Sequence, residues 1–217
     1  MIQKIKETVT RDIEVEYPLN QNDKLESYIG LYDLGDTETC QNLINMVDNL
    51  WDKKAEDPNW NDSGQIDFED PSNHGLSKDR RDDRALFISN GDYNSDTRKL
   101  QGWLQIAYDA YVSKYAIEHE MTSYVSKFHQ AEAYSSGYAA LHYEQAGGNS
   151  SKRNITWIVY LNDITDGSGC TEFPTYGIKS PPKAGRVGLF PAAYTHYHRG
   201  NIPYTRKSYA TGWFECV

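Results

Sequence analysis

Residues 153–163 read RNITWIVYLND, a run dominated by β-branched and aromatic residues. Such a composition is typical of a buried strand. Because successive side chains of a strand point to opposite faces, Thr156, Ile158 and Tyr160 are expected on one face. The opposite face would be entirely hydrophobic and consist of Ile155, Trp157, Val159 and Leu161.

Similar short segments follow one another from about residue 131 to the C-terminus, separated by turns rich in Gly, Pro, Asn and Asp. Short strands with this punctuation are typical of β-sandwiches and jelly rolls. Residues 12–17 (DIEVEY) and 28–34 (YIGLYDL) also indicate strands. Residues 84–89 (RALFIS) are strand-like, and residues 52–78 have the composition of a long polar loop, so these two segments are candidates for a lid or a substrate groove.

Two helices are expected before the β-rich part. The first follows a potential cap at Asp36, and the second begins after residues 90–96 (NGDYNSD). Apolar residues recur at helical spacing in both: Leu43, Ile44, Val47, Leu50 and Trp51, then Leu100, Trp103, Leu104, Ala107, Tyr108, Tyr111 and Tyr115. We therefore predict an α+β protein with a β-sandwich or jelly-roll core and packed N-terminal helices.

The chain has 217 residues and a formal net charge of −9. This length fits one domain over residues 1–217, with a helical and loop-rich support region (1–130) and a β-rich core (131–217). Nucleic-acid binding is disfavoured, because it depends on basic surfaces that neutralise phosphates. The basic-looking run at residues 78–84, KDRRDDR, contains three aspartates of its own.

Cysteine usage and hydropathy point to the cytoplasm. Cys40, Cys170 and Cys216 are far apart and form no CxxC pair, which argues against a disulfide framework. The N-terminal residues lack the apolar core of a signal peptide, and no apolar run is long enough to span a membrane. We therefore expect a cytoplasmic protein without a membrane partner.

Histidines and a glutamate are concentrated in residues 140–145 (ALHYEQ) and 194–200 (YTHYHRG). His142 and Glu144 are two residues apart, so on a strand they would point to the same face. With one distant histidine, they would form the two-histidine, one-carboxylate set that binds Fe(II) and leaves coordination positions open. An HxE pair alone also arises by chance, and both His196 and His198 are candidates for the distant ligand.

The C-terminal part, roughly residues 130–215, resembles the 2-oxoglutarate- and Fe(II)-dependent dioxygenases. The likeness is to their prolyl-4-hydroxylase-like branch, which includes small phage-encoded and bacterial members. Motifs of this family occur here in the family's order. They are YSSGYAALHYE (134–144), RNITWIVYLND (153–163), GSGCTEFP (167–174), PPKAGRVGLFPA (181–192) and HRGNIPYTRKSYATGWF (198–214).

The resemblance implies a double-stranded β-helix, the cupin-like jelly roll, with a metal site of His142, Glu144 and His198. His198 has the family's spacing to Pro203 and Lys207, which leaves His196 near the site or at the surface. Most members have aspartate at the carboxylate position. Glutamate is one methylene longer, and its presence favours hydroxylation over halogenation.

The resemblance also implies a site for the cosubstrate 2-oxoglutarate. Its far carboxylate would bind Lys207, which has the family's spacing of six to Trp213. Tyr160, Thr156 and Tyr134 would contact the same molecule. Arg206 and Trp213 would lie nearby, with Arg206 pointing to the other face of the strand.

The implied reaction uses Fe(II), 2-oxoglutarate and O₂, with ascorbate as a supporting reductant, and yields succinate, CO₂ and a hydroxylated product. Family analogy points to a prolyl or other residue of a peptide or protein, and a small-molecule substrate is an alternative. Another possibility is a non-catalytic module that binds a metal or a small acid. A nucleic-acid demethylase is disfavoured by the acidic charge balance.

Overall fold

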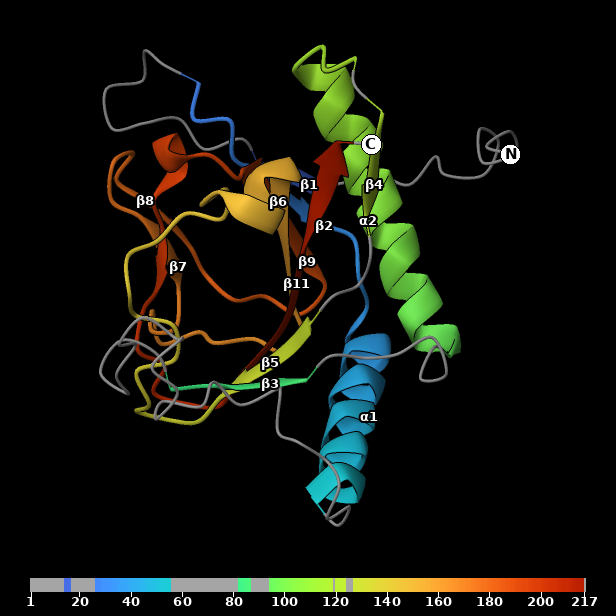
Figure 1. Cartoon of the computed structure of the whole chain (residues 1–217). Helices are drawn as coiled ribbons and strands as arrows, with labels where there is room; N and C mark the ends of the chain where they lie inside the picture. The colour runs from blue at the N-terminus through green and yellow to red at the C-terminus, as the bar shows by residue number, and fades with distance from the viewer. Residues whose placement is uncertain are drawn as a thin grey trace.

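The computed structural model of the chain describes residues 14–16, 26–55, 82–86, 94–118, 120–123 and 127–216. Within these residues, eight strands form one antiparallel sheet, here called the major sheet, and three short strands form a minor sheet. The helices α1 (Thr37–Ala55) and α2 (Ser95–Lys114) cover one side of the major sheet, and the minor sheet lies on the other side (Figure 1).

The strands of the major sheet follow a path that joins both halves of the sequence. Their order is β1 (Glu14–Glu16), β2 (Gly30–Asp33), β9 (Arg186–Pro191), β6 (Arg153–Tyr160), β11 (Lys207–Cys216), β5 (Lys127–Ala131) and β3 (Arg84–Leu86), and β4 (Met121–Ser123) pairs with β11. The order in the minor sheet is β10 (Arg199–Gly200), β7 (Thr171–Phe173) and β8 (Ile178–Ser180). Two 3-10 helices, η3 (Gly148–Lys152) and η4 (Tyr194–His196), lie between strands. This architecture confirms the predicted α+β class with a jelly-roll core.

Both predicted helices are confirmed, including the cap of the first. The Asp36 carboxylate accepts a hydrogen bond of 2.7 Å from the backbone N–H of Thr39. Asn94 caps α2 in the same way, and such caps satisfy N–H groups that have no partner within the helix. Helix α1 continues to Ala55, so residues 52–55 are helical and not part of the predicted loop. The rest of that loop, 56–78, lies outside the described residues.

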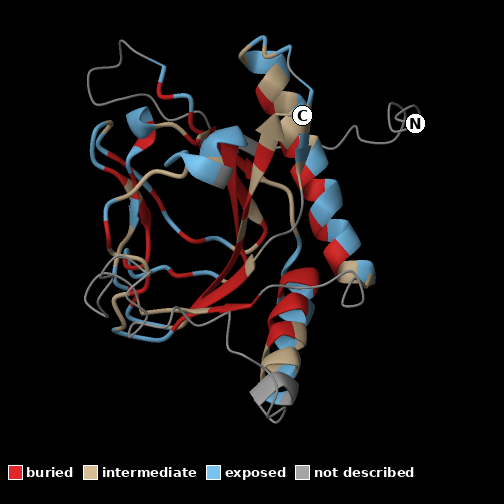
Figure 2. Cartoon of the chain, in the orientation of Figure 1, coloured by how far each residue is buried: buried red, intermediate tan, exposed pale blue. Residues whose placement is uncertain are grey.

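Strand β6 separates two hydrophobic clusters, as its alternation predicts. Trp157 and its neighbours on one face pack with apolar side chains of α1 and α2. Ile158 and Tyr160, on the other face, pack with Phe173 and Ile178 of the minor sheet. Figure 2 shows buried residues between the layers and exposed residues on the outer faces of both helices. The face that points away from the helices is the one that lines the pocket described below.

The N-terminal region contributes strands as well as helices. Strands β1 and β2 lie within the two N-terminal segments predicted to be strands, and β3 begins the segment RALFIS, of which residues 87–89 lie outside the described residues. The turn after β2 is joined to the turn before β9, where Gly35 donates a 2.9 Å hydrogen bond to the carbonyl of Gly185. A Cβ on Gly185 would lie 2.4 Å from the Cα of Gly35, so this contact requires glycine. Strands β1, β2, β3 and β4, which all lie within residues 1–130, thus belong to the same sheet as the strands of the C-terminal part.

Neither α1 nor α2 has the length and apolar character needed to cross a membrane, and these are the α-helices of the described part of the chain.

Candidate metal centre

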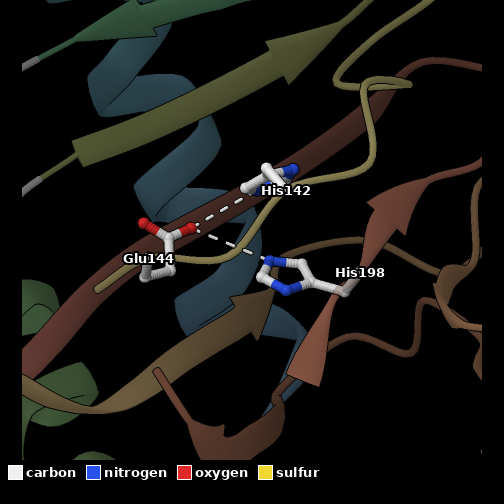
Figure 3. A group of neighbouring side chains, drawn as sticks. All are labelled: His142, Glu144 and His198. Atoms are coloured by element: carbon white, nitrogen blue, oxygen red, sulfur yellow. Dashed lines mark ion pairs between the residues drawn. The ribbon is translucent and has the colours of Figure 1, made fainter. Parts of the chain in front are cut away.

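Two imidazoles and one carboxylate converge at the predicted position. His142, Glu144 and His198 each offer a ligand atom, and these atoms lie within 4.8 Å of one another. The Glu144 Oε1 atom lies 3.4 Å from Nε2 of His142 and 3.7 Å from Nε2 of His198 (Figure 3). Neighbouring ligands of an octahedral ion with bonds of about 2.1 Å are separated by about 3 Å, so small movements would bring all three atoms to a common cation.

The backbone joins the two histidine-bearing segments directly. The N–H of His142 donates to the carbonyl of His198 at 3.0 Å, and the N–H of His198 donates in return at 2.9 Å. This pair is an isolated β-bridge. The prediction that His142 and Glu144 lie on a regular strand is therefore wrong. Glu144 is fixed instead by its N–H, which donates to the carbonyl of Ala192 at 3.1 Å.

Both histidines are oriented by hydrogen bonds from their other ring nitrogen. Nδ1 of His142 lies 2.7 Å from the carbonyl of Ala140, and Nδ1 of His198 lies 3.0 Å from the carbonyl of His196. A carbonyl only accepts, so Nδ1 carries the proton and Nε2 presents a lone pair to the centre. Burial lowers the pKa of His198 to about 4, which keeps this ligand unprotonated at neutral pH.

His196 does not reach the centre with its side chain. Its Nε2 lies 2.8 Å from the carbonyl of Ser27, and its ring stacks on Tyr176. Its backbone carbonyl orients His198, as described above. The assignment of His198 over His196 therefore agrees with the positions of the two rings.

The carboxylate of Glu144 is held by two residues. The indole Nε1 of Trp213 donates to Glu144 Oε2 at 3.0 Å, and Arg153 contacts the same oxygen at 3.3 Å. The guanidinium of Arg153 also lies 3.4 Å from the ring centroid of Trp213. Burial alone would raise the pKa of Glu144, but its hydrogen-bond and charge partners lower it below its usual range, and the guanidinium of Arg153 is the permanent cation among them. Oε1 is thus left to face the two imidazoles. Arg153 was not predicted as a site residue, although it begins the strand quoted first.

Lys207 lines the same pocket, which has a volume of about 180 Å³. The side chain is 4 % exposed, and its ammonium lies 4.8 Å from the ring centroid of Tyr209 and 5.4 Å from that of Tyr160. Among the described residues, no carboxylate pairs with this ammonium. Burial lowers the pKa of Lys207 to about 8. The hydroxyl of Thr156, also buried in this pocket, has no hydrogen-bond partner in the described part of the chain.

The predicted tyrosine contacts differ in the structure. The Tyr160 hydroxyl donates to Thr171 Oγ1 at 2.8 Å, so its bond to a cosubstrate stays a prediction. Tyr134 is 74 % exposed, stacks on Tyr204 and does not line the pocket, so its position does not support the predicted contact. Tyr138 lines the pocket instead and stacks on His142 at 3.8 Å. Tyr138 lies four residues before His142 in the sequence, and this short distance was the feature that could have indicated its place in the pocket.

Arg206 lies away from the centre. Its guanidinium pairs with Asp48 of α1 and lies 3.7 Å from Glu132. Because Lys207 and Arg206 are adjacent on an extended segment, they point to opposite sides. The predicted division between a buried Lys207 and an Arg206 on the other face is therefore correct, and a role for Arg206 next to the site has no support.

These residues fit the groups that the resemblance implies. Two oriented imidazoles and a braced carboxylate suit Fe(II) as a facial ligand set. Among the described residues, the buried ammonium has no carboxylate paired with it and the buried hydroxyl has no hydrogen-bond partner, so the two suit a carboxylate group in the same pocket. The pocket therefore combines a cation site and an anion site.

Comparisons with known proteins agree with this geometry. Residues 128–215 match the model of the 2OG-Fe(II) oxygenase superfamily. No curated protein matches the chain.

Several solved structures share the fold. The viral collagen prolyl hydroxylase from Paramecium bursaria Chlorella virus-1, solved with 2OG, has a TM-score of 0.63 at 19 % identity, covering 88 % of this chain and 97 % of its own. A Pseudomonas putida prolyl-4-hydroxylase has a TM-score of 0.60 at 14 % identity, covering 88 % and 94 %. A Trichoplax adhaerens prolyl hydroxylase, in complex with a hypoxia-inducible-factor peptide fragment, has a TM-score of 0.60 at 18 % identity, covering 88 % and 84 %.

The matched segment contains both histidines, the carboxylate and Lys207. The similarity to the 2OG-Fe(II) oxygenase superfamily thus extends over residues 128–215, the part of the chain that contains the candidate metal centre.

Proposed function

We propose that this chain is a 2-oxoglutarate-dependent dioxygenase that hydroxylates a C–H bond, on a prolyl residue of a peptide or protein. The observation that carries the proposal is one pocket containing both the His142, Glu144 and His198 group and the buried ammonium of Lys207. A structural role does not explain the buried ammonium, because burying a cation costs several kcal/mol when no carboxylate pairs with it directly, and none of the described carboxylates does.

Each residue has a defined task in this proposal. Nε2 of His142, Nε2 of His198 and Oε1 of Glu144 would hold Fe(II) on one face. Lys207 and the Thr156 hydroxyl would bind the far carboxylate of 2-oxoglutarate. When bound, iron and cosubstrate supply the oxidising chemistry that places one atom of O₂ in the product and the other in succinate, with release of CO₂.

The remaining pocket residues would orient and shield the substrate. Arg153 and Trp213 hold the outer oxygen of Glu144, which keeps one oxygen directed at the metal. Tyr138 covers one face of His142 and lines the pocket. Excluding water from the pocket matters because the oxidising chemistry must act on the substrate and not in side reactions.

A prolyl substrate is supported by likeness alone. Three of the solved structures that share this fold are prolyl hydroxylases, and one of them was solved with a peptide fragment. A small-molecule substrate remains the alternative within the same chemistry. The three cysteines are unpaired, in keeping with the reducing cytoplasm that we propose as the compartment.

The test is succinate formation in air with Fe(II), ascorbate and 2-oxoglutarate, with and without proline-rich peptides. We expect slow formation of succinate without substrate and a stimulation by a peptide that gains one oxygen atom in its mass. Glu144→Ala should abolish both. Glu172→Ala is the matched control, because Glu172 pairs with Arg199 and Lys179 at the surface.

A non-catalytic binding module is the second candidate, favoured by the glutamate at the ligand position. It would bind Fe(II) and 2-oxoglutarate without forming succinate. Binding with no succinate under any condition would therefore refute the dioxygenase and favour the module, whereas absence of binding would refute both.

A further inference from the structure

A short segment from the first half of the chain lies beside the pocket. Strand β3 pairs with β5, and the N–H of Asp82 donates to the carbonyl of Gly137 at 2.6 Å. Asp82 and strand β3 precede the segment that matches the family model, and residues 82–84 end the run KDRRDDR. The run has an acidic member, Asp83, whose side chain is 0 % exposed.

The Asp83 carboxylate contacts two aromatic side chains of different strands. Its Oδ2 lies 2.7 Å from Nδ1 of His129 on β5 and accepts a 3.1 Å hydrogen bond from the Tyr209 hydroxyl on β11. His129 and Tyr209 are paired across the two strands, and their rings stack at 4.8 Å with an angle of 7°. One carboxylate thus fixes both rings of a stacked pair.

The stacked pair belongs to the wall that holds Lys207. His129, Tyr209 and Lys207 all line the pocket. Tyr209 is two residues after Lys207 on β11, so their side chains share a face, and the ammonium lies 4.8 Å from the Tyr209 ring. A cation over an aromatic face is attracted by the ring, most strongly when both are desolvated.

We propose that Asp83 is a positioning residue of the cosubstrate site: through Tyr209 and His129 it fixes the wall that directs the Lys207 ammonium at a dicarboxylate ligand. This inference rests on the proposed function. It gives the segment outside the matched domain a task in cosubstrate binding. A buried carboxylate is costly, and a task of this kind explains why one is placed beside an anion site.

Asp83 also acts on Lys207 through its charge. The charged and titratable groups around the ammonium in the described part of the chain are Asp83 on β3, Cys170 before β7, Tyr160 on β6, and Tyr209 with the nearby Lys127 and His129 of the pocket wall. Burial lowers the pKa of Lys207, and the negative charge of Asp83 opposes this lowering. Burial raises the pKa of Cys170, so that group is a neutral thiol at neutral pH. Asp83 is then the anion that favours a charged Lys207.

The test compares binding of 2-oxoglutarate and Mn(II), measured by calorimetry without turnover over pH 6 to 9. We expect Asp83→Asn to weaken 2-oxoglutarate binding about tenfold and to leave Mn(II) binding unchanged. The alkaline limit of 2-oxoglutarate binding should also move to lower pH, because the amide no longer favours the charged lysine. For Asp83→Asn, a loss of 2-oxoglutarate affinity that is equal at every pH would be purely structural and would overturn the proposed role.

Two further variants keep the test decisive if Asp83→Asn folds poorly. Tyr209→Phe keeps the ring and removes the hydroxyl, so binding should weaken about threefold with an unchanged alkaline limit. Asp33→Asn is the matched control, because Asp33 is paired with Arg186 and Lys183 away from the pocket. It should lower stability and leave both affinities unchanged.

The outcomes separate the two proposals. If the wild type binds no 2-oxoglutarate in the presence of Mn(II), the proposed function fails and the role of Asp83 fails with it. If the wild type binds and both Asp83→Asn and Tyr209→Phe bind equally well at every pH, Asp83 is not a positioning residue, while the dioxygenase stands. Equal losses of Mn(II) and 2-oxoglutarate affinity would also overturn the proposed role.

Discussion

The two faces of strand β6 contrast sharply although their residues alternate in sequence. One face, with Trp157 and Val159, is fully buried against the helices and contains no charged group. The other carries Thr156 and Ile158, which line a pocket together with Lys207 and Glu144. The same strand therefore serves stability on one side and ligand binding on the other. Substitutions on the two faces should affect different measurements.

The largest effect is expected on the pocket face, at a proposed ligand. His198→Ala removes a nitrogen directed at the metal and should weaken Co(II) or Fe(II) binding by more than about 100-fold, beyond the effect of losing an outer hydrogen-bond partner. The folded state should persist, because the helix face is untouched. Visible absorption of the Co(II) complex and thermal unfolding by circular dichroism measure the two effects. Unchanged metal affinity would contradict the ligand assignment.

The opposite pattern is expected for Trp157 on the helix face. Trp157→Ala should lower the free energy of unfolding by about 3–5 kcal/mol, as large truncations in cores do. It also removes the 2.8 Å hydrogen bond from the indole to Ser123. Urea unfolding checks the loss, and Trp157→Phe should show a smaller one. If folded Trp157→Phe protein lost metal affinity, the two faces would not be independent.

A substitution of Lys207 should change stability and ligand binding in opposite directions. The lowering of its pKa from 10.5 to about 8 corresponds to a cost on the order of 3 kcal/mol for keeping the buried ammonium charged at neutral pH. The unfolded chain binds more protons between these values, so the stability of the ligand-free protein should rise from pH 8 towards pH 10.5. Lys207→Met should raise the melting temperature at pH 7, abolish this rise and lose 2-oxoglutarate binding. A melting temperature below that of the wild type would contradict the prediction.

The smallest effect is expected from removing the hydrogen bond that Trp213 donates to Glu144. Trp213→Phe keeps a ring for Arg153 to stack on and removes the N–H that holds Oε2. Metal affinity should fall about tenfold, within the range for outer hydrogen-bond partners. Trp157→Phe is the matched control, because it loses an indole N–H on the helix face. Equal metal affinities for the two variants would show that the hydrogen bond from Trp213 to Glu144 does not contribute to metal binding.

The sequence was sufficient for the features that depend on local periodicity. The alternation in β6 and the cap at Asp36 are short-range patterns, and the structure agrees with both. The spacing of Lys207 to Trp213 was implied by the family resemblance, and both residues line the pocket. The choice of His198 followed from its distance to later motifs, and the ring of His196 indeed contacts Ser27.

The remaining features depend on contacts that no local pattern encodes. His142 lies on an irregular segment held by a bridge to His198, so strand alternation did not apply to it. The resemblance implied a contact from Tyr134, whereas Tyr138 lines the pocket, because the path of the backbone between them decides which ring enters it. In the sequence, Asp83 is one of three aspartates in the run KDRRDDR, and its burial follows from the pairing of β3 with β5.

Because Trp213 donates a hydrogen bond to Glu144, the fluorescence of this tryptophan should report metal binding at the centre. The indole is linked to the candidate iron ligand by a single 3.0 Å contact, so a paramagnetic ion arriving at Oε1 should quench its emission. Trp103 of α2 and Trp157 of β6, both buried in the core, would supply a steady background. Loading of the centre could thus be followed in real time in the unlabelled protein.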